Sequence, residues 1–126
     1  MKITSFNPLI VSQHSEDIIK LFEALGFERI HRKTDIEGGA NTSVSMRDAN
    51  GFQVNVASSN HVPQDVSTIR INVDDFDEAC ALFTSHGFVN PRGDKITETS
   101  SSMDTFLVSP SGFSVTLCHH VKDEER

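Results

Sequence analysis

The stretch MRDANGFQVNV at residues 46–56 returns as LVSPSGFSVTL at residues 107–117, an offset of 107 − 46 = 61 residues. In each copy a turn-forming segment, DANG or SPSG, leads into Phe and then an alternation of Val or Leu with polar residues. Such turn segments commonly join two antiparallel strands, and glycine permits the backbone conformation of a tight turn. The stretch therefore predicts a β-hairpin that is formed once in each half of the chain.

The same offset relates residues over most of both halves, which indicates an internal repeat of one module. The matched pairs are Ile10 and Ile71, Leu21 and Leu82, Phe22 and Phe83, Gly26 and Gly87, Phe27 and Phe88, Gly51 and Gly112, Phe52 and Phe113, Val54 and Val115, and Val56 and Leu117.

Each half predicts the order strand, helix, strand, strand, strand. Alternation of apolar and polar residues predicts the strands, and apolar residues at helical spacing predict the helices. The expected strands are FNPLIVS, FERIHRK, NTSVSMRD and FQVNVAS in the first half, and STIRINV, a segment near FVN, SMDTFLVS and FSVTLCHH in the second. The helices carry the apolar stripes Ile18, Ile19, Phe22, Leu25 and Phe76, Ala79, Cys80, Phe83.

The ends of both helices are marked in the sequence. Asp75 with Glu78 resembles a capping box at the start of the second helix. Ser15 is the expected cap of the first helix, followed by the acids Glu16 and Asp17 in its first turn. Gly26 and Gly87 stop the two helices.

Composition narrows the class of protein. The chain has 126 residues, 37% hydrophobic and 23% charged, which suits one folded domain. No apolar run approaches the roughly 18 residues of a membrane span, and the first residues make a poor secretion signal, so we expect a cytoplasmic protein with no membrane partner. The net charge of −7 disfavours nucleic-acid binding. Cys80 and Cys118 are expected to be free thiols.

Three features resemble the vicinal oxygen chelate superfamily, which includes glyoxalase I, extradiol dioxygenases, fosfomycin-resistance enzymes and bleomycin-resistance proteins. They are INVDDFDEACALFTSHGF, LIVSQHSEDIIKLFEALGFE and the two Gly-Phe hairpins, and together they cover nearly the whole chain. The resemblance implies an α+β fold in which two fused βαβββ modules, residues 1–60 and 66–120, form a curled mixed sheet with a shared cleft within one domain, 1–126. It also implies a homodimer. Whether the modules pair within one chain or between chains stays open.

The resemblance also locates the positions that hold the metal in metal-using members. By landmark, these positions are Asn7, Asn55, Thr68 and Thr116 in this sequence. Neutral amides and hydroxyls alone bind first-row divalent ions weakly, whereas imidazole, thiolate and carboxylate bind them well. We therefore expect no metal and no cofactor.

Alternation along the first and last strands of each module predicts the residues that line the cleft: Asn7, Gln53, Asn55, Thr68, Arg70, Asn72, Ser114, Thr116 and Cys118. Arg70 can donate two parallel hydrogen bonds to a carboxylate or phosphate in the cleft. An arginine at a sheet edge that extends into water is an equally good interpretation of this position. Phe106 breaks the repeat, since it matches Ser45, and is expected in a cleft wall or an interface. Residues 91–102 form either a lid over the cleft or a plain connection.

Three functions fit this sequence. The first is a metal-free protein, related to glyoxalases and bleomycin-resistance proteins, that binds a small polar organic molecule in its cleft. The second is a metal-dependent lyase, isomerase or dioxygenase that uses His31, His120 or Cys118. The third is a non-catalytic dimeric interaction module.

Overall fold

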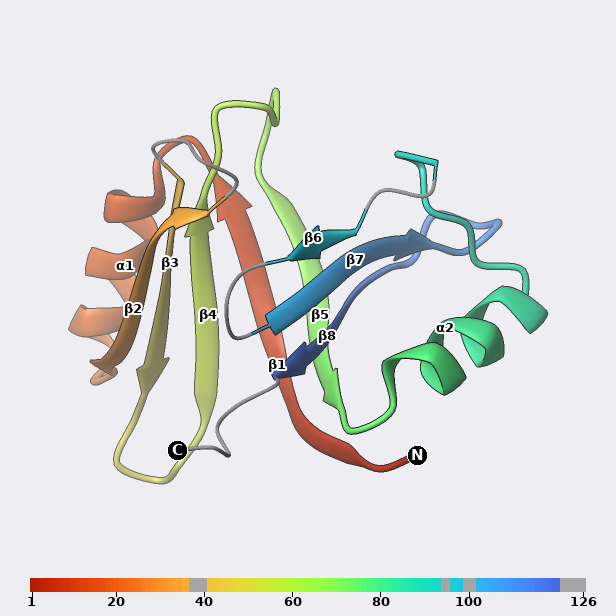
Figure 1. Cartoon of the computed structure of the whole chain (residues 1–126). Helices are drawn as coiled ribbons and strands as arrows, with labels where there is room; N and C mark the ends of the chain where they lie inside the picture. The colour runs from red at the N-terminus through yellow and green to blue at the C-terminus, as the bar shows by residue number, and fades with distance from the viewer. Residues whose placement is uncertain (37–40, 94–95, 99–101, 121–126) are drawn as a thin grey trace. The chain divides into compact units, whose positions relative to one another are not determined.

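The order of strands and helices follows the sequence prediction. The computed structural model describes residues 1–36, 41–93, 96–98 and 102–120 (Figure 1). Its elements are β1 (Ile3–Ser12), α1 (Ser15–Ala24), β2 (Glu28–Ile36), β3 (Asn41–Arg47), β4 (Gln53–Ser58), β5 (Val66–Val73), α2 (Phe76–Ser85), β6 (Thr97–Glu98), β7 (Ser102–Val108) and β8 (Ser114–His120). The expected α+β class is confirmed.

The chain divides into two units. We call Asn7–Ser67 the first unit, and Met1–Phe6 together with Thr68–Arg126 the second unit. The strand order is β2-β3-β4-β1 in the first unit and β6-β7-β8-β5 in the second, so corresponding strands occupy corresponding places. The last strand of each half pairs in parallel with the first, and the hairpin strands pair antiparallel.

The hairpin between β3 and β4 forms where the sequence predicts it. Gly51 has a φ of 89°, a backbone conformation that residues with a Cβ rarely adopt. The Asp48 carboxylate accepts hydrogen bonds from the backbone N–H groups of Asn50 and Phe52, at 3.0 and 2.9 Å. The equivalent turn between β7 and β8 uses Ser109, whose hydroxyl accepts from the Phe113 N–H at 3.0 Å.

The core of the first unit lies between α1 and one face of its sheet. Ile19 of α1 packs with Val44, Met46, Val54 and Val56, and each of these side chains is at most 3% exposed. α1 runs beside β2, β3 and β4 (Figure 1). Burial of these aliphatic side chains is the main stabilising contribution to this unit.

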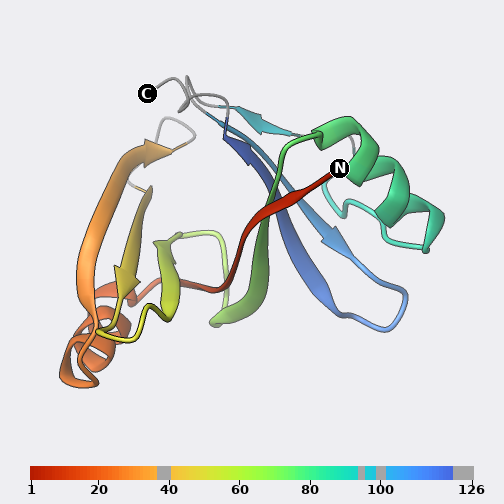
Figure 2. The same cartoon turned by 90° about the horizontal axis from the view of Figure 1, so that it is seen from below.

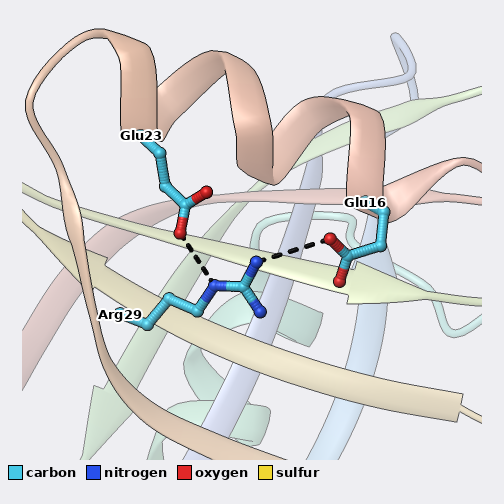
Figure 3. Close-up of polar contacts among 3 residues, drawn as sticks. All are labelled: Glu16, Glu23 and Arg29. Atoms are coloured by element: carbon cyan, nitrogen blue, oxygen red, sulfur yellow. Dashed lines mark hydrogen bonds and ion pairs between the residues drawn. The ribbon is translucent and has the colours of Figure 1, made fainter.

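Arg29 joins the start of β2 to both ends of α1 (Figure 3). Its Nε lies 3.0 Å from a carboxylate oxygen of Glu23, and its Nη2 lies 3.4 Å from one of Glu16. The hydrogen bond to Glu23 is the main reason that the pKa of Arg29 rises above its ordinary value. All three groups reach solvent, so these ion pairs add little to the free energy of unfolding. Their effect is to orient α1 on β2.

The second unit has the same construction around α2. Phe76 and Ala79 of α2 pack on Ile71, Val73, Leu107, Val115 and Leu117, with Ile69, Phe83 and Phe88 at the margin. Figure 2 shows α2 on one side of β7 and β8. Asp75 caps this helix by accepting from the Glu78 N–H at 3.0 Å, as predicted. The Glu78 carboxylate pairs with the N-terminal amine at 2.9 Å instead of completing a capping box.

Residues Met1–Phe6 belong with the second unit, whereas the sequence analysis placed them with the first half. β1 begins at Ile3, earlier than the expected Phe6, and its first residues bond to the end of β5. The Lys2 N–H donates to Asp74 Oδ1 at 2.6 Å, the Asp74 N–H donates to the Lys2 carbonyl, and the Thr4 hydroxyl donates to the Asn72 carbonyl at 3.2 Å.

Two local predictions are wrong. The N-cap of α1 is His14, not Ser15, and it makes no side-chain cap bond. The Ser12 hydroxyl stabilises the turn between β1 and α1 instead. It accepts a hydrogen bond from the His14 N–H and donates one to the Asp65 carboxylate.

Residues 88–90 form no strand, since Val89 makes only an isolated bridge to Val108, and β6 is Thr97–Glu98. Pro91 has no N–H to extend that bridge into a ladder.

Neither helix in the described ranges is long and apolar enough to cross a membrane.

Replacing Leu117 by Ala is expected to lower the free energy of unfolding by about 2–5 kcal/mol, because the side chain is fully buried and leaves a cavity. Replacing Leu82, which is 44% exposed on α2, by Ala is the matched control and should cost about 0.5 kcal/mol. Urea unfolding of the two variants measures the difference. Equal losses would show that the core of the second unit is not centred on β8.

Candidate functional site

The sheet of the second unit has a face that α2 does not cover. Ile69, Ile71 and Val73 point toward α2, so the intervening side chains of β5 point to the opposite side. The same alternation applies along β7 and β8. We call this side the Arg70 face; its side chains are Thr68, Arg70, Asn72, Asp104, Phe106, Ser114, Thr116 and Cys118.

Strand register arranges the Arg70 face in rows. Thr116 lies opposite Arg70 on one side and Phe106 on the other. Cys118 lies between Asn72 and Asp104 in the same way. Three strands therefore bring together a guanidinium, a carboxylate, an amide and hydroxyls that are far apart in the sequence.

Three buried polar atoms on this face have no hydrogen-bond partner in the described part of the chain: Thr68 Oγ1, Asn72 Oδ1 and Asp104 Oδ1. Thr68 is 5% exposed and Asn72 is 9% exposed. Leaving a buried acceptor or hydroxyl unpaired costs about 1–3 kcal/mol, so such atoms are rare in folded proteins. Their gathering on one face makes the Arg70 face the candidate site of the second unit.

Arg70 is half-buried on this face. Among residues 1–36, 41–93, 96–98 and 102–120, no carboxylate lies within ion-pair distance of it. The guanidinium is therefore not ion-paired within those ranges, and it acts on the Cys118 thiol instead. β5 is an internal strand of the sheet, so Arg70 does not lie at a sheet edge.

Cys118 is fully buried in the middle of the Arg70 face. Burial raises the pKa of its thiol strongly; Asp104 raises that pKa further, and Arg70 opposes the rise. Both charged side chains therefore reach the thiol, yet the protonated form prevails. A thiol that stays protonated is a poor nucleophile.

The remaining candidates of the metal-enzyme hypothesis are His120, which follows His119 on β8, and His31 on β2. His119 points away from the Arg70 face, and its Nδ1 lies 2.8 Å from the Val73 carbonyl oxygen. His120 is exposed at the end of β8. His31 lies opposite Ser45 in the register of β2 and β3, and its side chain is outside the described part. No group of three or more His, Cys, Asp or Glu side chains suited to a metal occurs among the described residues.

The first unit has an equivalent face, opposite α1. Asn55 lies there, 4% exposed and directly opposite Leu9 of β1. Its Nδ2 donates to the Ser45 hydroxyl at 2.7 Å, whereas its buried Oδ1 has no partner among the described residues. Gln53 and Asn7 are half-buried and share this face by alternation.

The four mapped metal positions do not fit a metal. Alternation places Asn7 and Asn55 on the helix-free face of the first unit, and Thr68 and Thr116 on that of the second. Their donors are neutral, and Arg70 stands directly opposite Thr116. A fixed cation beside neutral oxygens disfavours a divalent cation and favours an anion.

Sequence reasoning missed Asp104. The residue alternates with Phe106 along β7, so the alternation used for the neighbouring strands would have placed it on the Arg70 face. The lid prediction for residues 91–102 stays a prediction, because 94–95 and 99–101 lie outside the described residues.

Thiol labelling is expected to distinguish the two cysteines. Cys80 is partly exposed on α2, with a pKa raised mainly by burial, and should react slowly with a disulfide reagent in the folded protein. Cys118 should react only after unfolding. A Cys80→Ser variant isolates Cys118, and rapid stoichiometric labelling of that folded variant would show that Cys118 is accessible and ionisable.

No protein-family model and no curated protein matches this sequence. Solved structures do match it. Methylmalonyl-CoA epimerase from Mycobacterium tuberculosis matches at 13% identity with a TM-score of 0.69, over 95% of this chain and 90% of that one. Streptomyces coelicolor methylmalonyl-CoA epimerase, a variant in complex with 2-nitronate-propionyl-CoA, matches at 19% identity with a TM-score of 0.64, over 96% and 100%.

A third structure, a glyoxalase/bleomycin resistance protein/dioxygenase superfamily member from Vibrio splendidus 12B01, matches at 14% identity with a TM-score of 0.60, over 94% of this chain and 99% of that one. Such low identities establish the architecture and leave the chemistry to the residues on it. The strand order, the parallel pairing of first and last strands and these likenesses agree: the chain has the fold of the vicinal oxygen chelate superfamily.

Proposed function

We propose that this protein binds a small polar organic molecule without a metal, through the helix-free faces of its sheets. The observation that carries the proposal is the set of buried polar atoms near Arg70, those of Thr68, Asn72 and Asp104, that have no partner among the described residues. Neutral hydroxyls, amides and one guanidinium are the groups with which proteins orient polar organic ligands.

The likeness to known structures supports an organic ligand. Streptomyces coelicolor methylmalonyl-CoA epimerase, of the same fold, holds 2-nitronate-propionyl-CoA. The residues of the present chain support the binding function, because neutral side chains stand beside Arg70 and no group of three or more metal-ligating side chains occurs among the described residues.

Elemental analysis before and after incubation with Zn, Mn, Ni and Fe(II) tests the metal-free part of the proposal. We expect no stoichiometric metal under any of these conditions. Binding of about one metal per chain, removed by a chelator together with a catalytic activity, would favour the lyase, isomerase or dioxygenase alternative.

A thermal-shift screen of small carboxylates, amino acids, sugars and phosphate esters tests the binding part. A ligand present at about 100 times its Kd adds roughly 2.7 kcal/mol to the stability of the folded state, which raises Tm measurably. Arg70→Met should weaken the shift given by an anionic compound, whereas Lys20→Met, a matched loss of charge on the exposed side of α1, should not. No shift with any compound would contradict the proposal.

We also propose that the two units are copies of one βαβββ module. We further propose that the protein is cytoplasmic and that it forms a homodimer. Large apolar side chains reach solvent on both units, among them Leu25 and Phe52 on the first and Phe113 on the second, at 63%, 66% and 50% exposure. Light scattering after size-exclusion chromatography should give twice the mass of the 13.9 kDa chain. A monomer at all concentrations would exclude the dimer.

A further inference from the structure

We propose that the Arg70 face binds a small zwitterion, a molecule with a carboxylate and a nearby ammonium group: the carboxylate bonds to Arg70, and the ammonium bonds to Asp104 and Asn72. This inference rests on the proposed function, because it names the ligand class for the same face. It lies within the second unit and uses only residues of β5, β7 and β8.

The anionic end of the ligand follows from the surroundings of Arg70. The guanidinium has no carboxylate partner among the described residues, and its nearest neighbour across the strand is the neutral Thr116. Thr68, two residues earlier on the same face, has a buried hydroxyl with no partner in the described ranges. A carboxylate on Arg70 accepts two parallel hydrogen bonds from the guanidinium and has lone pairs left for a hydroxyl such as that of Thr68.

The cationic end follows from the row that contains Cys118. Asn72 and Asp104 flank Cys118 in register, and each has a buried Oδ1 without a partner in the described part of the molecule. Both atoms only accept hydrogen bonds. An ammonium group has three donors, so it can bond to both atoms and also neutralise the Asp104 carboxylate.

The residues that bind the two ends of the ligand lie close together. Arg70 and Asn72 are two residues apart on β5, which separates their Cα atoms by roughly 6.6 Å. The long side chain of Arg70 spans part of that separation, and Arg70 and Asp104 both act on the same Cys118 thiol. A small amino acid has its two charges at a matching distance. Phe106, half-buried in the row of Arg70, offers an apolar surface for the carbon atoms between them.

A lone anion explains these observations less completely. Acetate or phosphate on Arg70 would leave the acceptors of Asn72 and Asp104 unpaired and would bring a second negative charge toward Asp104. A lone amine would leave Arg70 without an anion. Only a ligand that donates at one end and accepts at the other pairs all of the available groups at once.

Isothermal titration of the full chain with matched probes tests the inference. The amino acids are alanine, β-alanine and γ-aminobutyrate; the comparison compounds are propionate, ethylamine and N-acetylalanine, each of which lacks one charge. We expect saturable binding of at least one amino acid, about tenfold tighter or more than any comparison compound. In labelled protein, the amide signals of β5, β7 and β8 should shift, while those of α1 should not.

Two substitutions separate the two ends. Asp104→Asn keeps the size of the side chain and removes its charge, so it should weaken amino acid binding about tenfold and should not weaken propionate binding, because a nearby negative charge is removed. Arg70→Met should weaken both. Lys20→Met is the control and should change neither. Should either variant fail to fold, the comparison of alanine with N-acetylalanine on the unaltered protein still decides the question.

The outcomes separate this inference from the proposed function. Propionate binding as tightly as the amino acids would overturn the ammonium end, and failure of all amino acids while another polar compound binds would overturn the inference as a whole. In both cases the proposed function would stand. Failure of every compound would indicate that water alone fills the face and would overturn both.

Discussion

Side-chain alternation along the strands is the constraint on which the rest of this structure depends. The described part of each unit has one helix, and one helix covers only one face of a sheet. Residues such as Ile69, Ile71 and Val73 supply the apolar surface beneath α2, so every second residue of the same strand must point the other way. A shift of the register by one residue would expose the core and bury the polar set, which makes the two faces interdependent.

The Arg70 face lowers the free energy of unfolding, because it contains buried polar atoms that have no hydrogen-bond partner among the described residues. A fold selected only for stability would place apolar side chains there, as it does beneath α2. Arg70 and Asp104 could also have formed an ion pair, yet they do not approach within ion-pair distance. Groups held apart and only partly bonded are characteristic of binding sites, where a ligand supplies the missing partners.

The comparison with known structures shows how far a fold constrains chemistry. Glyoxalase I and methylmalonyl-CoA epimerases share this architecture with the present chain at identities below 20%. Here the four positions that the resemblance assigns to a metal hold two amides and two hydroxyls on the helix-free faces. One architecture can therefore carry different sets of side chains, and the residue types set what is bound.

The sequence by itself determined the order of the elements, the two hairpins and the two cores. These are local features, since Gly51, the Asp75 cap and the period of Val54 and Val56 act within a few residues of one another. It failed where distant segments bond to each other: β1 begins early because Lys2 bonds to Asp74, and Ser12 bonds to Asp65 where Ser15 was expected to cap α1. The strand expected near Val89 was a local error, since Pro91 limits it. The tertiary structure alone decided which polar side chains meet. Pairing of β5 with β8 and of β8 with β7 sets Asn72, Cys118 and Asp104 side by side, and only that packing buries Oδ1 of Asn72 and of Asp104 without a partner among the described residues.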